Sequence, residues 1–188
     1  MTQKNLSTRT MVLGAILTAL VIVLQVMGAF VRFGPFSISL VLIPIVIGAA
    51  TCGIGVGAWL GFVFGVAVLL SGDAAAFMAV NVVGTIITVL AKGTACGYLA
   101  GLTYKLLRGH NPYLAVIASA IVCPIVNTGV FLIGCLLFFM ETITQWAGGT
   151  NVGTYMIVVL VGLNFVVELA TNVVLSPVIS RLLMIREK

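Results

Sequence analysis

Long apolar runs, separated by short polar or glycine-rich breaks, make up most of this sequence of 188 residues. A transmembrane helix needs about 20 mostly apolar residues, so the chain has room for five to seven such helices. The breaks divide it into six. The sequence therefore predicts an all-α fold, with residues 1–188 forming a single transmembrane domain. The predicted helices cover about residues 10–28, 38–52, 56–70, 81–107, 113–140 and 154–185.

The breaks between the predicted helices are rich in residues that interrupt helices or prefer water. The clearest stop signal is the basic, glycine- and proline-containing segment 105–112. Segments 29–37, 71–80 and 141–153 are also predicted to be loops. The second predicted helix is short for a membrane crossing and contains Pro44, so we expect it to be bent or tilted.

The composition favours a lipid bilayer over water as the surroundings of this chain. Hydrophobic residues make up 62% of it and charged residues 7%, whereas a soluble domain carries roughly a quarter charged residues. These values exclude a soluble enzyme, a nucleic-acid-binding protein and a disordered linker, despite the net charge of +5. The sequence has no phosphate-binding G-x-x-x-x-G-K-[ST] loop.

Basic residues are distributed unevenly between the two predicted membrane surfaces. Seven lie on the side that carries both termini, and only Arg32 lies on the opposite side. Because cytoplasmic loops carry an excess of Lys and Arg, we predict that both termini are cytoplasmic. The seven residues are Lys4, Arg9, Lys105, Arg108, Arg181, Arg186 and Lys188.

Two ionisable side chains, Lys92 and Glu168, fall deep within predicted helices. Each lies thirteen residues before a cytoplasmic basic residue. At about 1.5 Å per residue, both then lie at nearly the same depth, past the midplane toward the outside. An isolated charge there costs several kcal/mol and needs a partner or a wet cavity. The pair is therefore either a structural ion pair or part of a ligand pocket open to the outside.

Amide side chains near these charges favour the pocket. Asn164, Glu168 and Asn172 share one helical face at spacings of four residues, and Asn127 follows Pro124 in the fifth predicted helix. Each amide alone could form an ordinary hydrogen bond between helices, but together they exceed what packing requires. The candidate substrate-binding residues are Lys92, Asn127, Asn164, Glu168, Asn172, Asn81 and Arg32.

The sequence contains no pattern typical of a metal or catalytic centre. Its four cysteines lie singly in or beside apolar segments without C-x-x-C spacing, and His110 lies in a basic turn. We therefore predict no metal ion, no cofactor and no enzymatic activity.

Small residues recur every four positions in three of the predicted helices. Such ridges let helix backbones approach closely in lipid, and we expect the two glycine ridges to pack within the bundle. A shorter alanine pair in the first helix is ambiguous from spacing alone. The ridges are Gly57, Gly61 and Gly65; Gly93, Gly97 and Gly101; and Ala15 and Ala19.

Taken together, these features resemble the S components of energy-coupling factor (ECF) transporters, which are small six-helix subunits that capture vitamins. The resemblance covers essentially the whole chain. It rests on its size and six helices, on Gly14-Ala15-Ile16-Leu17-Thr18-Ala19-Leu20, and on Lys92-Gly93 leading to Ala100-Gly101-Leu102. The stretch 36–65 is similar to the folate-, pantothenate- and riboflavin-type members. In the family, an A-x-x-x-A motif packs against coupling helices of the shared transmembrane subunit, and Ala15 and Ala19 match it.

The resemblance implies how such a subunit works. It would bind its substrate from outside, beneath the loops 29–37 and 71–80, and topple in the membrane on docking to a coupling subunit with two ATPases. Its location would be the plasma membrane of a bacterium or archaeon. The alternative functions are a stand-alone secondary transporter or channel for a small polar solute, a membrane enzyme, and a purely structural membrane protein.

The sequence constrains the substrate only partly. Lys92, with Arg32 near the outer mouth, could meet a carboxylate, as in pantothenate or folate. A neutral polar ligand fits if Lys92 and Glu168 neutralise each other. Residues 31–37 lack the acidic group expected for riboflavin-type members, and the chain has only two tryptophans, which argues against a thiamine pocket.

Overall fold

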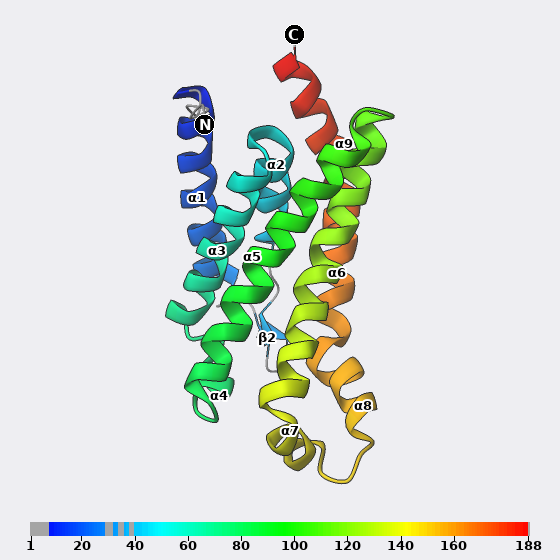
Figure 1. Cartoon of the computed structure of the whole chain (residues 1–188). Helices are drawn as coiled ribbons and strands as arrows, with labels where there is room; N and C mark the ends of the chain where they lie inside the picture. Colours follow the sequence, from blue (N-terminus) through cyan, green and yellow to red (C-terminus); the bar gives the residue numbers. More distant parts are fainter. Residues whose placement is uncertain (1–7, 29–31, 34–35, 38–39, 188) are drawn as a thin grey trace.

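In the computed structural model, which describes residues 8–28, 32–33, 36–37 and 40–187, the long helices run along a common axis (Figure 1). They are α1 (Thr8–Gly28), α2 (Leu42–Cys52), α3 (Ile54–Leu70), α5 (Val82–Leu107), α6 (Pro112–Phe138) and α9 (Leu163–Glu187). The short elements are β1 (Arg32–Phe33), β2 (Phe36–Ser37), α4 (Ala75–Met78), α7 (Met140–Ala147), α8 (Val152–Tyr155) and a π-helical segment, Met156–Gly162.

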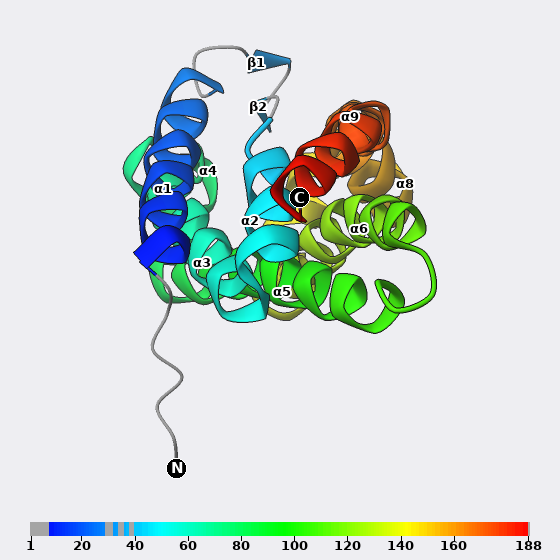
Figure 2. The ribbon, with the colours of Figure 1, turned by 90° about the horizontal axis from the view of Figure 1, so that it is seen from above.

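The short helix α2 lies inside the bundle. Seen from above, α1, α3, α5, α6 and α9 surround it (Figure 2). Its residues Leu42, Ile45 and Val46 are fully buried, which explains why this segment is apolar on every side. Gly53 then separates α2 from α3 with a φ of 98°, a left-handed conformation that glycine adopts without steric cost.

Local sequence signals define the ends of the other helices. The Asn81 side chain caps α5 by accepting a hydrogen bond from the Gly84 N–H at 2.9 Å. Asn111 caps α6 in the same way, and Pro112 occupies the first turn of that helix. Both arrangements satisfy N–H groups that a helix start leaves without partners.

The two glycine ridges pack within the bundle, as predicted, and the structure shows that the ridge of α3 lies directly against that of α5. A Cβ atom added at Gly61 would collide with the carbonyl of Gly93, and one added at Gly93 would collide with the carbonyl of Gly61. Gly57 and Gly97 form a second reciprocal contact of this kind. The backbones therefore touch along this seam, and no side chain separates them.

The prediction of a loop over 141–153 is wrong, because this stretch contains α7 and the start of α8. Helix α7 is strongly amphipathic, with Ile143 and Ala147 buried one turn apart. Ile143 belongs to a small apolar cluster that includes Phe77 and Phe139, and Ala147 is buried on the same face of the helix. The polar residues of the segment cover its other face, and these residues had suggested a loop. The loop predicted over 71–80 likewise contains the short helix α4.

Helices α1, α5 and α6 are each long and apolar enough to cross a membrane. The segment Val152–Gly162 and the following Asn164–Pro177 would form a fourth crossing, with a bend of 44° between them. Helices α2 and α3 are apolar but shorter, with 11 and 17 residues. The structure is therefore an all-α helical bundle with three to four candidate membrane spans. The start of α1, the turn between α5 and α6 and the end of α9 lie at the same end of it (Figure 1).

Candidate binding cavity

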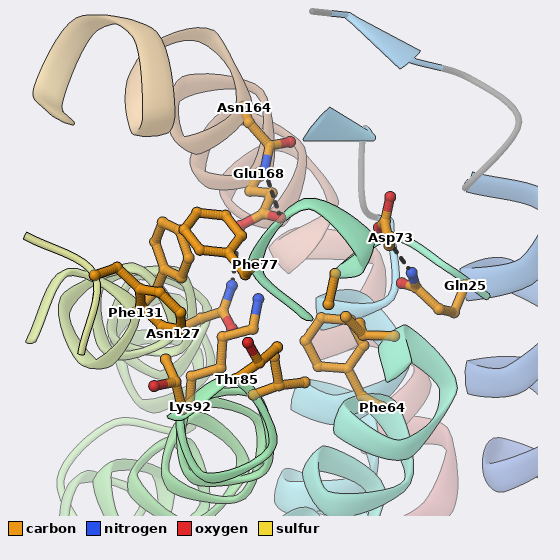
Figure 3. Close-up of a pocket in the computed structure, with 15 residues that line it drawn as sticks. Gln25, Phe64, Asp73, Phe77, Thr85, Lys92, Asn127, Phe131, Asn164 and Glu168 are labelled. Carbon is orange, nitrogen blue, oxygen red and sulfur yellow. Dashed lines mark hydrogen bonds between the residues drawn. The ribbon is translucent and has the colours of Figure 1, made fainter. Parts of the chain in front are cut away.

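A cavity lies toward the end of the bundle that carries α4, between the two apolar clusters of the core. Its empty space, including the part open to the surroundings, amounts to about 630 Å³. Four phenyl rings line it, from Phe64, Phe77, Phe131 and Phe139. The polar lining comes from α1, α5, α6, α9 and the segment before α4 (Figure 3).

The Lys92 side chain reaches into this cavity from α5 (Figure 3). Its Nζ lies 5.5 Å from the ring centroid of Phe64 on α3 and 5.5 Å from that of Phe131 on α6, and aromatic faces attract a cation at this distance. Within the described part of the chain, no ion pair closer than 4.0 Å joins Lys92 to Glu168. The direct ion pair that the sequence allowed is therefore not formed.

Glu168 lines the same cavity from α9 and is 2% exposed. Asn127 Nδ2 donates to its Oε2 at 3.5 Å, and Asn164 Nδ2 donates to its Oε1 at 3.4 Å. Asn172 Nδ2 donates to the Glu168 main-chain carbonyl at 2.8 Å. The carboxylate is thus held by two long hydrogen bonds from amides on two different helices.

Several buried oxygen atoms at the cavity accept no hydrogen bond from the residues that the structure describes. These are Asn127 Oδ1, Asn164 Oδ1 and Thr88 Oγ1, and Asn172 Oδ1 lies in the same state one turn beyond Glu168. Leaving a buried polar group without a partner costs about 1–3 kcal/mol, and most such groups in native proteins are satisfied. The cavity therefore offers hydrogen-bond acceptors to a polar molecule that enters it.

Among the described lining residues, the geometry combines the Lys92 cation, a set of acceptors and aromatic walls, which is the make-up of a binding site for a polar organic molecule. A family model described as "ECF transporter, substrate-specific component" matches residues 9–180. The chain belongs to this family. It is thus the substrate-specific S component of an ECF transporter, a transport subunit that associates with an ECF module, and not an enzyme. No curated protein and no solved structure gives a significant match.

Two irregularities in the helices of this S component flank its cavity residues. Pro124 lies inside α6, three residues before Asn127. Because proline has no N–H, the carbonyl one turn before it lacks its usual helical donor. The π-helical segment Met156–Gly162 directly precedes Asn164 at the start of α9. Such segments interrupt the regular α-helical register and occur often at functional sites.

The remaining predicted site residues of the S component lie elsewhere. Asn81 uses its side chain as the cap of α5, and Asn172 is buried behind Glu168. Arg32 lies in β1, and its side chain is outside the described part of the structure. On α1, both Ala15 and Ala19 are exposed. No group of three or more potential metal ligands occurs among the described residues.

Sequence reasoning missed Gln25 and Asp73, which also line the cavity. Gln25 Nε2 donates to Asp73 Oδ2 at 3.0 Å and to Ser71 Oγ at 3.4 Å. An amide within the apolar run 10–28 was the signal that could have identified Gln25. The phenyl rings beside Lys92 had no comparable signal, because phenylalanine in an apolar helix is expected whether or not it lines a site.

Proposed function

We propose that this S component binds a small water-soluble micronutrient, such as a vitamin, in the cavity around Lys92. The observation that carries the proposal is the position of the Lys92 ammonium group. It lies between two phenyl rings and faces the cavity without an ion-pair partner among the described carboxylates. A cation in an apolar protein interior is costly unless it is paired, so an anionic group of the substrate would stabilise it.

The chemistry of the cavity suggests a substrate with two kinds of polar group. A carboxylate or other anionic group would meet Lys92. Hydroxyl or N–H groups would donate to Glu168 and to the amide oxygens of Asn127 and Asn164. Neither amide oxygen has a donor among the described residues. An apolar or planar part would pack against Phe77 and Phe131. Arg32, Asn81 and Asn172 are assigned no direct contact in this scheme.

The proposal includes an arrangement in the membrane. The chain would cross the plasma membrane of a prokaryote six times, with α2 and α3 as short crossings and both termini in the cytoplasm. The cavity would then open to the outside, beneath the segments 29–37 and 71–80. After binding, the subunit would topple as α1 docks through Ala15 and Ala19 on the transmembrane coupling subunit, which works with two ATPases.

Mass spectrometry of the purified subunit tests the proposal by identifying a compound that co-purifies with it. Calorimetric titration of that compound then compares the wild type with Lys92→Met. Losing a charge-assisted hydrogen bond costs about 1.5–3 kcal/mol, so we expect the affinity to fall roughly 10- to 150-fold. Lys105→Met makes the same change on the exposed end of α5 and should bind like the wild type. Equal affinities for wild type and Lys92→Met would refute the assignment.

A further inference from the structure

Helix α1 presents different residues to the bundle and to its surroundings. Leu17, Val21 and Gln25 recur every four residues and are the buried positions of the helix. Ala15, on another face, is exposed. Ala19 and Gln25 are six residues apart, or about 9 Å along the helix axis. One continuous helix therefore carries both the proposed docking surface and a side chain that lines the cavity.

The Gln25 side chain joins α1 to the segment that follows α3. Residues 71–80, which include α4, are called the lid here, and Asp73 and Phe77 of the lid line the cavity. The Gln25 amide is 2% exposed and donates to Asp73 Oδ2 and Ser71 Oγ. Hydrogen bonds to charged groups are stronger than neutral ones, so the bond to Asp73 is the stronger tether.

The lid also packs into the cavity through Phe77. This ring makes edge-to-face contacts with Phe131 and Phe139 on α6, at centroid distances of 5.6 and 5.0 Å. Phe131 is in turn one of the two rings beside the Lys92 ammonium. A substrate that touches Lys92 and Phe131 would thus also affect where Phe77 and the lid lie. The lid is in turn hydrogen-bonded to α1 through Gln25.

We propose that Gln25 is a positioning residue that couples occupancy of the cavity to the docking of α1 on the ECF module. The inference rests on the proposed function, which assigns the substrate to the cavity and docking to Ala15 and Ala19. When substrate holds the lid in place, the bond from Gln25 to Asp73 fixes the outer end of α1. When the lid moves away, α1 loses this tether. By thermodynamic linkage, docking changes substrate affinity by the same factor.

The test measures the dissociation constant of the subunit–module complex in nanodiscs, with and without a saturating amount of the compound identified by mass spectrometry. The ratio of the two constants reports the coupling, which is typically 5- to 150-fold between linked sites. We expect Gln25→Met, which keeps the length of the side chain but donates no hydrogen bond, to bring the ratio within about twofold of one. Val26→Leu, at the neighbouring exposed position, should keep the wild-type ratio.

Variants of the acceptor examine the same bond from the lid. Asp73→Asn retains an oxygen that can accept from Gln25 and should keep most of the ratio, whereas Asp73→Leu should abolish it. Asp73→Leu also replaces Gln25→Met as the decisive variant if the latter does not fold. A wild-type ratio of one, or an unchanged ratio in Gln25→Met, would overturn the inference. Neither result changes the substrate affinity expected for Lys92→Met. A failure of the coupling inference is therefore distinguished from a failure of the proposed binding site.

A measurement without substrate or module examines the tether directly. Spin labels on α1 at Val23 and on α4 at Ala76, both exposed, report the distance between the helix and the lid by pulsed electron resonance. In Gln25→Met we expect a broader distance distribution than in the wild type. An equally narrow distribution would show that Gln25 does not hold the lid, and the inference would fail.

Discussion

Lys92 and Glu168 illustrate how a charge can be accommodated in an apolar bundle without a direct opposite charge. The Lys92 ammonium lies between two aromatic rings, and the Glu168 carboxylate accepts hydrogen bonds from two amides. Each group has neutral partners of its own, and both face one cavity. This arrangement leaves the charges available to a ligand, whereas a closed ion pair would satisfy them internally.

A four-member mutant cycle tests this interpretation. Glu168→Met leaves the amides of Asn127 and Asn164 without their acceptor. We expect the free energy of unfolding to fall by about 1–3 kcal/mol for each buried group left without a partner, and the melting temperature to fall with it. Lys92→Met should affect stability less, because it removes no direct ion pair. The double variant should fold yet bind the co-purified compound at least tenfold more weakly, because methionine cannot pair with polar substrate groups.

The cycle is measured by thermal melting and calorimetric titration in detergent or nanodiscs. A double variant that is as stable as the wild type and binds like it would return the two residues to a structural role. The family membership would stand, because the match extends over residues 9–180 and does not depend on these two side chains.

At the scale of elements, apolar runs and the helix-breaking residues between them predicted most of the helices from sequence. The helix starts at Asn81 and Asn111 follow from local chemistry that a sequence contains. Helix α7 was missed because its few buried residues are recognised only once their distant partners, such as Phe77, are in place. The polar face of α9 was found because amides at four-residue spacing stand out in an apolar helix. The bond from Gln25 to Asp73 spans 48 residues, and no local pattern indicates it.

The docking role of α1 predicts a specific effect of bulk on its exposed face. Ala15→Trp or Ala19→Trp should abolish uptake in vesicles containing the ECF module, because an indole would fill the groove that a partner helix enters. Substrate binding by the isolated subunit should change less than twofold. Leu137→Trp, at an exposed apolar position of α6, is the matched control and should support normal uptake. Loss of binding together with uptake would place the alanines inside the bundle.

The contact between α3 and α5 predicts opposite outcomes for two Gly→Ala substitutions. Gly61→Ala places a methyl group against the Gly93 carbonyl and should lower stability by about 1–3 kcal/mol. Gly129→Ala in α6 meets no atom within 4 Å and should be neutral or stabilising by up to about 1 kcal/mol. Thermal melting in detergent compares the two variants. Equal stability of Gly61→Ala and Gly129→Ala would mean that α3 and α5 can separate enough to accommodate the added methyl group.

At the scale of the whole molecule, the distribution of basic residues and the arrangement of the helix ends favour the same orientation. The start of α1, the end of α9 and the turn between α5 and α6 share one end of the bundle, and the lid and α7 lie at the other (Figure 1). Lys105 and Arg108 lie at the first end. Under the positive-inside rule, this distribution supports the proposed orientation, in which that end faces the cytoplasm.

Topology reporters test this orientation and the last two of the six proposed crossings. A fluorescent protein fused after Lys188 should fold and fluoresce in the cytoplasm, and one inserted between Gly109 and His110 should do the same. Alkaline phosphatase inserted at Gly148–Gly149 should be active, because the segment between α7 and α8 would lie outside the membrane on the far side. A phosphatase active after Lys188 would reverse the proposed orientation.

The glycine seam between α3 and α5 also limits how this sequence can change over evolutionary time. A clash between two side chains can be relieved by a smaller residue at the partner position. At Gly61 and Gly93 each backbone already faces a backbone, and no smaller residue exists for either position. A substitution there has no local suppressor, so its reversal or a shift of the whole helix is the only remedy. The glycines along the contact between α3 and α5 must therefore be kept together, while the residues that line the cavity remain free to change toward new substrates.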